Sequence, residues 1–350
     1  LEMFHQEIVK TLFNGAHGPV AKRVKNLCAQ CDTFLANNRS PHRAFVYDQV
    51  VSFGELLSTS IICAYLNHVG IAAEWVDARS CIKTDNFYRS AHLNWEQTQS
   101  AIQDQIQGNV LKVTQGFIAS DMNNFTTTLG REGSDYTAAI FAYCLGATDV
   151  TIWKDVQGVL NADPRVFDKT QLLEHISYQE AIELAFYGAS VIHPKTLQPL
   201  QRKEIPLYVK SFLNPKQKGT KVGKGVPMQP EIPCYIVKKG LSLLRLSTRD
   251  FSFVVEDNIS DIFKLLHEHK MSVDVIQNSA ISFSVCVEDT YHKMDALLLA
   301  LRSRFDVKHT PDVSLYTIRH FEENSANTLL STHDLVLEQR TATTLQLVLK

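Results

Sequence analysis

The turn TTLGREGSD, residues 127–135, holds two charged side chains between two glycines and runs directly into a helical pattern. Gly130 and Gly133 allow a ligand to approach the backbone closely, and Ser134 and Asp135 can cap the helix that follows. The free amide hydrogens at a helix start favour an anion. The turn therefore suits a phosphate or a carboxylate. Short glycine motifs recur by chance, so an ordinary glycine turn with an N-cap remains an open interpretation.

A second polar turn, WKDVQGVLNADPR, comes directly after a buried strand pattern at 148–153. This order predicts that Lys154, Asp155, Asp163 and Arg165 lie at the carboxyl end of a sheet. Ligands of open α/β sheets bind at that edge. The second turn therefore favours a ligand site over a chance glycine motif.

A third polar segment, VVSFGELLS at 50–58, puts a glycine, a glutamate and a serine at the predicted start of a helix. The patterns GxxxxGK[ST] and GxGxxG are absent, which excludes a standard P-loop or Rossmann site. No helix carries zinc-ligand spacing of His and Glu, and no GxSxG elbow occurs, which argues against a hydrolase. The single CxxC pair, Cys28 and Cys31, has no second pair and lies in a helical pattern, so we interpret it as packing.

The elements that must position these turns alternate between strand and helix, as in an α/β domain. The helical patterns cover 1–13, 19–37, 54–69, 134–147 and 177–189, and the strand patterns cover 72–78, 110–119 and 148–153. This order predicts a mostly parallel sheet with helices on both faces.

A stretch rich in proline, glycine and lysine at 214–233 predicts a domain boundary. Beyond it, residues 241–310 follow the order β-α-β-β-α-β, which makes a small antiparallel sheet with both helices on one face. Further strand patterns over about 312–350 resemble an abbreviated second copy. We therefore predict two domains, 1–228 and 234–350.

Bulk composition limits the classes of partner. The chain has 350 residues, with 35 Lys and Arg against 37 Asp and Glu, so its formal net charge of -2 gives no reason to expect nucleic acid or an acidic membrane surface. Seven scattered cysteines fit a reducing compartment better than a disulfide framework. No run of eighteen apolar residues and no signal peptide is found, so a cytoplasmic protein is expected.

Seven ordered segments closely resemble the aspartokinases of the amino-acid kinase family. They are SFGELLS, GFIASD, TTLGREGSDYTAA, WKDVQGVLNADPR, SYQEAIELAFYGASVIHPKTLQP, IPLYVKSFLNP and the Gly-Thr at 219 and 220. The resemblance covers nearly all of the chain. It implies an amino-acid kinase fold followed by an ACT regulatory module of ferredoxin-like βαββαβ type. The implied reaction is ATP-dependent phosphorylation of the L-aspartate β-carboxylate to 4-phospho-L-aspartate, with Mg²⁺ bridging the phosphates.

The resemblance also implies roles for single residues. Glu55 should face the α-amino group of aspartate, and Ser52 belongs to the same substrate-binding segment. Arg131 should grip a substrate carboxylate as a two-point fork, and Ser134 should help to hold it. Asp135 should orient a catalytic lysine, which makes Asp135 and Arg131 the implied catalytic pair. Capping of helices by Glu55 and Asp135 is the alternative.

By the same resemblance, one set of residues should surround the adenine, ribose and phosphates of ATP. These residues are Lys154, Asp155, Leu160 and Arg165, with Gly130 and Gly133 of the turn. The alternatives are that Arg165 only closes the DPR turn and that Lys154 is a solvated charge at a strand end. Lys154 also departs from the family, which usually carries a small hydroxyl residue there. His193, before Pro194, is expected to make a structural hydrogen bond at a helix start.

Two further departures concern the phosphate site. The family begins with a strand that ends in Lys-Phe-Gly-Gly, and this chain has no such motif, so we expect it to be truncated upstream and to lack its main phosphate clamp. Glu132 stands where the family usually has glycine. Its negative charge beside an anion-binding turn must point away or meet a cation.

The regulatory module is expected to bind an amino acid, with lysine as the first candidate, and to pair in a homodimer. Ala280 replaces a family glutamate there, which leaves the effector open. The expected effector contacts are Ser247, Thr248, Phe251, Ser272, Val273, Asp274, Asn278 and Ser279. Two other functions compete: a sister kinase for glutamate, acetylglutamate or a nucleotide, and a catalytically silent amino-acid-sensing subunit.

Overall fold

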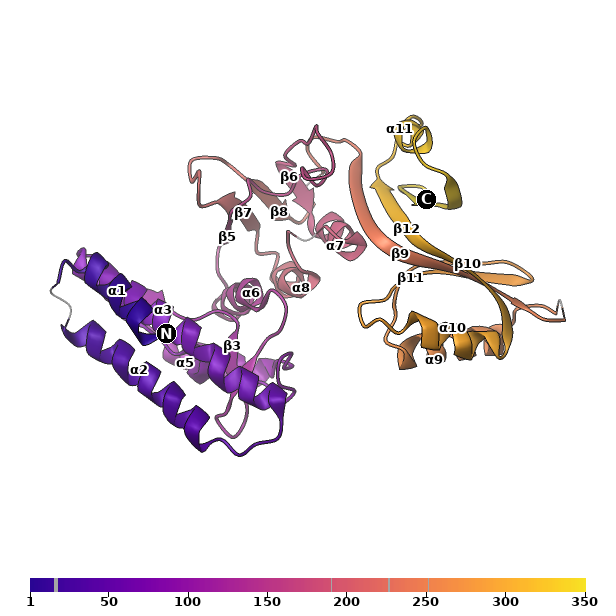
Figure 1. Ribbon diagram of the computed structural model, residues 1–350. Coiled ribbons are helices and arrows are strands. Elements are labelled where there is room, and N and C mark those ends of the chain that lie inside the picture. Colours follow the sequence, from indigo (N-terminus) through magenta and orange to yellow (C-terminus); the bar gives the residue numbers. More distant parts are fainter. Residues whose placement is uncertain (16–17, 190, 226, 251) are drawn as a thin grey trace. The chain divides into compact units, whose positions relative to one another are not determined.

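The computed structural model of the protein describes residues 1–15, 18–189, 191–225, 227–250 and 252–350, and these form two compact units (Figure 1). The first unit consists of Leu1–Asp155, Ile192–Gln217 and Lys221–Val226. The second consists of Val156–Val191, Lys218–Thr220 and Pro227–Lys350. Each unit contains hydrophobic clusters of its own.

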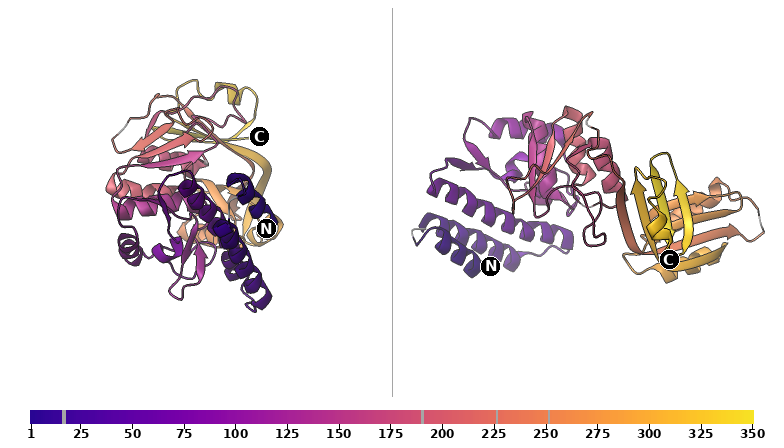
Figure 2. Two further views of the ribbon diagram at one scale, coloured as in Figure 1. Left: turned by 90° about the vertical axis from the view of Figure 1, so that its left-hand side faces the viewer. Right: turned by 90° about the horizontal axis from the view of Figure 1, so that it is seen from above.

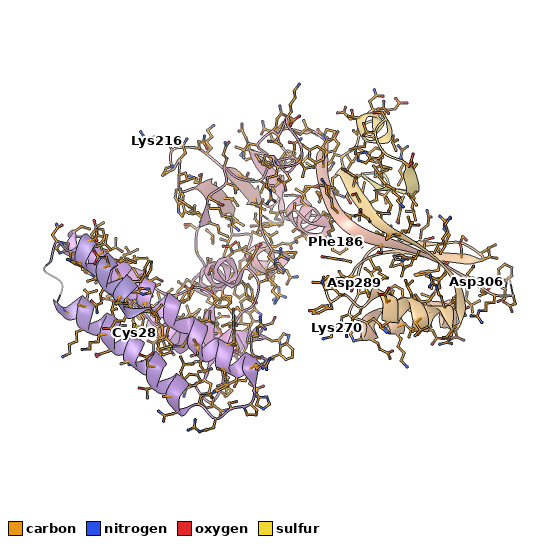
Figure 3. The ribbon with its side chains drawn as sticks, in the orientation of Figure 1. Cys28, Phe186, Lys216, Lys270, Asp289 and Asp306 are labelled. Atoms are coloured by element: carbon orange, nitrogen blue, oxygen red, sulfur yellow. The ribbon has the colours of Figure 1, made fainter. Side chains whose placement is uncertain are left out.

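Three helices open the first unit: α1 (Glu2–Leu12), α2 (Gly18–Asn37) and α3 (Arg43–His68). They lie side by side in both Figure 1 and Figure 2. Apolar side chains spaced along one face of each helix pack against those of the other two helices. Their shared core consists of Val9, Phe13, Val24, Cys28, Leu57 and Ile61. Cys28, labelled in Figure 3, and Cys31 are both buried on α2, so the two cysteines serve packing.

Helix α3 corrects one prediction, because it begins at Arg43 and the polar segment 50–58 lies inside it and not at its start. Gly54 lies within the continuous helix, and open space surrounds the position of its missing Cβ. By length and composition α3 is the one described helix that could cross a membrane. It packs on α1 and α2, and it buries Asp48 and Ser52, which is the character of a core helix.

Four short strands follow in this unit. β1 (Ala73–Trp75) pairs in parallel with β2 (Leu111–Val113), and β3 (Ile118–Ser120) pairs in antiparallel fashion with β4 (Thr126–Thr128). The single strand predicted over 110–119 is therefore wrong. The chain turns between β2 and β3, where Phe117 has a positive φ of 70°.

A second parallel pair is formed by β5 (Val150–Lys154) and β7 (Leu207–Ser211), with β8 (Thr220–Gly223) next to β7. Helices alternate with these strands, which confirms the predicted α/β pattern. The remaining helices of the first unit are α4 (Ala78–Cys81), α5 (Trp95–Gln105), α6 (Gly133–Leu145) and α8 (Pro194–Lys203).

The second unit is dominated by one six-stranded sheet with the strand order β10-β11-β9-β12-β14-β13. The predicted β-α-β-β-α-β order is confirmed. Its elements are β9 (Cys234–Thr248), α9 (Glu256–Glu268), β10 (Ser272–Asn278), β11 (Ser282–Glu288), α10 (Met294–Arg302) and β12 (Phe305–Arg319). The sheet is completed by β13 (Leu335–Arg340) and β14 (Thr344–Leu349), which follow the short α11 (Asn327–Leu330).

Two strands are longer than predicted. β9 extends back to Cys234, before the predicted start at 241, and β12 (Phe305–Arg319) runs across the boundary between the two predicted copies, 241–310 and about 312–350. Pairing of β9 with β12 continues across an irregularity between Thr310 and Val313, where the strand bends without ending. Figure 1 shows both as long, curved strands. The strands of the two predicted copies therefore belong to one continuous sheet.

Side chains alternate between the two faces of this sheet, as the pleat requires. Leu244 and Leu246 face a core shared with α9 and α10, whereas Leu243 faces a second core on the opposite side. That second core draws on all six strands, and Gln277 of β10 donates a hydrogen bond to the carbonyl of Glu338 on β13. The two edge strands therefore approach each other, and the sheet curls around its inner face.

The remaining part of the second unit contains β6 (His175–Ser177) and α7 (Tyr178–Tyr187). Ser177 caps α7 by accepting a hydrogen bond from the Glu180 amide. Glu180 is buried, and its carboxylate receives two hydrogen bonds from Arg319 at the end of β12. This bidentate ion pair connects α7 to the six-stranded sheet.

Candidate active site

The predicted anion-binding turn leads into α6, but it is capped differently from the prediction. The N-cap is Glu132, a left-handed residue with φ 53°, and it makes no side-chain cap hydrogen bond. Because the helix begins at Gly133, Ser134 and Asp135 lie in its first turn. Their predicted capping role is therefore wrong, and the Asp135 carboxylate is free for another partner.

That partner is Lys154 at the end of β5. Lys154 Nζ lies 2.8 Å from Asp135 Oδ2, and the two side chains are 22% and 16% exposed. The interpretation of Lys154 as a solvated charge at a strand end is wrong. Partial burial strengthens such a pair relative to one in water. The pair fixes an ammonium group beside the amino terminus of α6, where the helix itself favours anions.

Contacts within the protein explain why glycine occupies both positions of the turn, 130 and 133. Gly130 has φ 78°, and a Cβ there would lie 3.1 Å from Ser90 Oγ. A Cβ on Gly133 would lie 2.8 Å from Cδ2 of Phe117. Gly130 therefore needs glycine for its backbone conformation and for packing, and Gly133 needs it for packing. Direct approach of a ligand is not required to explain them.

Ser134 and Arg131 are exposed at this turn. Ser134 packs closely on the preceding strand turn, where a Cβ on Gly116 would lie 2.7 Å from its Oγ. Among the described residues, no carboxylate forms an ion pair with Arg131. Its guanidinium is therefore available for the carboxylate of a ligand.

Glu132 is partly buried, and its Oε2 is buried with no hydrogen-bond partner in the described part of the chain. Its charge acts on His193. Burial lowers the pKa of His193, the negative charge of Glu132 opposes that effect, and Lys195 and Arg131 add to it. His193 Nδ1 accepts a 3.1 Å hydrogen bond from the Lys195 amide and caps α8, as expected.

Glu55 and Ser52 are placed differently on α3. The Ser52 hydroxyl is buried and donates a 2.8 Å hydrogen bond to the Gln49 carbonyl, so it is engaged inside the helix. Glu55 is partly exposed, and burial raises the pKa of its carboxyl group. In the described structure this carboxylate has no ion-pair partner, which suits it to receive an ammonium group.

One aromatic residue connects α3 to the turn. Phe117 packs with Leu56 of α3, the neighbour of Glu55, and with Ile118 of β3. Its ring also fills the space beside Gly133. The sequence analysis missed this contact, because Phe117 showed only as one apolar residue within a strand pattern.

The remaining expected ATP contacts are divided between the units. Asp155 follows β5 in the first unit and is exposed. Leu160 and Arg165 belong to the second unit, where Leu160 is partly buried and bridges to Leu172. Arg165 is 84% exposed and pairs with Asp163 at 2.8 Å. In this structure Arg165 closes the DPR turn, and its hydrogen bond lowers the pKa of Asp163.

Thr220 supports the loop that contains Leu160. Its hydroxyl accepts a 2.8 Å hydrogen bond from the Val159 amide, and a Cβ on Gly158 would lie 2.6 Å from that hydroxyl oxygen. Gly158 has φ 149°. The Gly-Thr segment at 219 and 220 thus holds the loop's backbone from within the second unit.

Asp48 is a buried carboxylate that the sequence analysis missed. Asp48 Oδ2 accepts hydrogen bonds of 2.9 Å from the amides of Arg89 and Thr128, and its Oδ1 accepts one from the Thr128 hydroxyl. Burial raises the pKa of this carboxyl group, and these hydrogen bonds act in the opposite direction. An aspartate within an apolar helical pattern was the available signal. Asp48 attaches α3 to β4, which leads into the turn.

The expected effector residues gather around β10 and the end of β9. Asp274 pairs with Lys238, and its Oδ2 is buried with no hydrogen-bond partner among the described residues. Thr248 donates a 2.6 Å hydrogen bond to the Ser252 carbonyl, and Ser279 Oγ lies 2.8 Å from Ser282 Oγ. Phe251 lies outside the described residues. The other expected contacts are on or beside these strands: Ser247, Ser272, Val273 and Asn278.

Within the described residues, no group of three or more His, Cys, Asp or Glu side chains is arranged to hold a metal ion. All seven cysteines are free and buried.

A model of the amino acid kinase family matches residues 10–211. Lysine-sensitive aspartokinase 3 of Escherichia coli is 35% identical over 246 residues, which are 69% of this chain and 55% of that protein. The chain thus spans about half the length of this curated relative.

Two solved structures resemble the whole chain. The E. coli aspartokinase III in complex with lysine and aspartate aligns with a TM-score of 0.78 and 27% identity, over 95% of this chain and 78% of that one. The same enzyme in complex with aspartate and ADP aligns with a TM-score of 0.76 and 27% identity, over 94% and 77%. These likenesses agree with the observed elements and with the family match, and the chain belongs to the amino acid kinase family.

Proposed function

We propose that this chain is an aspartokinase, which transfers the γ-phosphoryl group of ATP to the β-carboxylate of L-aspartate and releases ADP and 4-phospho-L-aspartate. The observation that carries the proposal is the Lys154–Asp135 ion pair at the start of α6, beside the exposed Arg131. In this reaction a substrate oxygen is the nucleophile, so the protein supplies positioning and cations. The aspartate and ADP bound to the similar E. coli enzyme support the same substrate pair.

For aspartate, the proposed contacts come from α3 and the turn. Arg131 grips a carboxylate with two parallel hydrogen bonds, which a guanidinium provides and an ammonium does not. Glu55 receives the α-ammonium group, because its carboxylate has no ion-pair partner in the described structure and burial raises its pKa. Ser134 contributes a hydroxyl at the helix start. Ser52 positions α3 and does not contact aspartate directly, since its hydroxyl already donates a hydrogen bond to the Gln49 carbonyl.

For the nucleotide, we propose Lys154 as a cation for the phosphates, held in position by Asp135. Asp155, which follows Lys154 in the same unit, is the other proposed contact with ATP. Mg²⁺ is usually held by one or two carboxylates together with substrate phosphates. The exposed Asp155 next to Lys154 is the carboxylate that fits this requirement. Mg²⁺ would neutralise phosphate charge there.

The test uses the chain as it exists and measures binding separately from turnover. Calorimetric titration gives the affinities for ADP and for aspartate, and a hydroxamate assay follows aspartyl phosphate, with glutamate and UMP offered in parallel. Lys154→Met should weaken ADP binding by about 2 kcal/mol, typical of a lost charge-assisted contact, and leave aspartate binding intact. The matched control is Lys169→Met, at an exposed lysine of the second unit.

The outcomes separate the competing functions. Unchanged ADP affinity in Lys154→Met would remove Lys154 from the nucleotide site. Preference for glutamate or UMP would indicate a sister kinase. Binding of an amino acid without binding of ADP would indicate a sensing subunit and would refute the aspartokinase proposal.

We also propose that residues 234–350 form an ACT module that binds an amino-acid effector, with lysine first, and pairs in a homodimer. The similar E. coli enzyme was solved with lysine bound. Here Lys238 already supplies an ammonium group to Asp274, so a bound amino acid must compete with it. Residues 1–228 are the proposed kinase domain. The seven buried, free cysteines support a reducing compartment such as the cytoplasm.

A further inference from the structure

Two cations lie directly opposite each other on the inner face of the curled regulatory sheet. Arg245 of β9 and Lys308 of β12 are register partners in the antiparallel pairing of these strands. Arg245 is two residues from Leu243, and side chains two apart share a face, so both cations lie on the same side as the inner core. Like charges directly opposite each other destabilise a sheet.

Neither cation is neutralised by the protein. The cations of this sheet that form ion pairs are Lys238, Arg319 and Arg340. In the described part of the chain, no carboxylate forms an ion pair with Arg245 or Lys308. Asp306, labelled in Figure 3 near the start of β12, shares their face of the sheet but pairs with neither. Both side chains are exposed, so two positive charges without an ion-pair partner among the described residues lie side by side in contact with solvent.

A cavity of about 230 Å³ lies against these two residues. Thr310 adds a hydroxyl to its wall, and Leu243, Leu335 and Val336 make the rest apolar. Leu335 is 46% exposed, which is unusual for a leucine on the inner face of a sheet. The cavity exists because the sheet curls and brings β13 over β9 and β12.

We propose that this cavity is a binding site for a small organic carboxylate with a short aliphatic chain. Its carboxylate would lie between Arg245 and Lys308 and form charge-assisted hydrogen bonds with both, which removes their mutual repulsion. The aliphatic part would cover Leu243, Leu335 and Val336. A volume near 230 Å³ equals roughly eight water molecules, which is enough for a small acid.

The site differs from the proposed effector site in its chemistry, and from the proposed kinase site in its place on β9 and β12. Asp274 offers a carboxylate to an ammonium group, whereas Arg245 and Lys308 offer cations to an anion. A ligand without an amino group therefore does not test the Asp274 site, and the Arg245 and Lys308 variants separate the new site from Arg131. The test also needs neither ATP nor aspartate, so its outcome is independent of the proposed aspartokinase activity.

The experiment is calorimetric titration of the full chain with isovalerate at constant ionic strength. Isovaleramide, which has the same shape without the charge, and inorganic phosphate, which has charge without the aliphatic chain, serve as comparison ligands. We expect saturable binding of isovalerate only. Arg245→Gln and Lys308→Gln should each weaken it at least about tenfold, as expected for loss of one charge-assisted contact. Lys264→Gln, at an exposed lysine on α9, is the matched control and should bind as the parent does.

Thermal unfolding supplies a second measurement that does not depend on calorimetric heat. Without ligand, Lys308→Gln should unfold at a higher temperature than the parent, because one of the opposed charges is gone. Isovalerate should raise the unfolding temperature of the parent and not that of Lys308→Gln. Absence of saturable isovalerate binding by the parent, or equal binding by phosphate or by the double variant Arg245→Gln/Lys308→Gln, would overturn the proposal.

Discussion

Removal of the Arg319 charge should strongly destabilise the second unit. Arg319 Nη2 lies 2.7 Å from Glu180 Oε2, Nε donates to Oε1 at 3.1 Å, and Nη1 donates to Thr344 Oγ1 at 2.7 Å. Both charged side chains are 9% exposed. Arg319→Met keeps most of the apolar stem but leaves the Glu180 carboxylate buried without its main partner. Loss of one member of such a pair costs about 3 to 5 kcal/mol.

Burial alone would raise the pKa of Glu180, but hydrogen bonds from Arg319 and His320 outweigh it and hold the pKa below its usual range. A carboxyl group with a lowered folded-state pKa stabilises the fold above its unfolded pKa, and the contribution disappears as pH falls through the folded value. In Arg319→Met, the stability that Glu180 loses as pH falls should be smaller than in the parent. The variant and the parent should therefore converge in stability at low pH.

The assay is urea unfolding of the full chain, followed by circular dichroism at several pH values. The control is Arg304→Met, which breaks the more exposed pair with Asp261 and should cost less than about 1 kcal/mol. The double variant Glu180→Leu/Arg319→Leu should recover much of the loss, because neither buried charge of this pair then remains. A cost for Arg319→Met no larger than that for Arg304→Met would refute the argument that this pair connects α7 to the sheet.

Three further changes test the turn and its neighbours. Gly133→Ala should destabilise the first unit by about 1 to 3 kcal/mol in urea unfolding, because its Cβ would lie 2.8 Å from the Phe117 ring; equal stability would show that the ring yields. Glu132→Gly should raise the unfolding temperature, because glycine adopts the left-handed φ of 53° without strain and the buried Oε2, which has no hydrogen-bond partner among the described residues, is removed. A lower unfolding temperature would contradict this prediction. His193 has a lowered pKa, so its neutral form stabilises the fold above the unfolded pKa near 6.5, and this contribution is lost as pH falls. In His193→Gln the free energy of unfolding should therefore depend less steeply on pH. An unchanged pH dependence would assign the effect to another group.

The sequence by itself determined the class of fold and the place of the candidate site. Alternating strand and helix patterns predicted an α/β domain, and the β-α-β-β-α-β order predicted the sheet formed by residues 241–310. Both signals are local, because they depend on side-chain periodicity within one element. The turn at 127–135 and the strand end at Lys154 could be found in the same way, and the structure brings their charged side chains together.

Only the tertiary structure decided which partner each polar group takes. No pattern within the sequence indicated that Asp135 would meet Lys154 and leave helix capping to Glu132, or that Asp48 would bond to the distant Thr128. Helix boundaries were also missed where long-range packing overrides local signals, as at Gly54 inside α3. The opposed charges of Arg245 and Lys308 likewise depend on strand register, which is a property of two strands together. Periodicity specifies which residues are buried, but pairing between distant segments requires the folded chain.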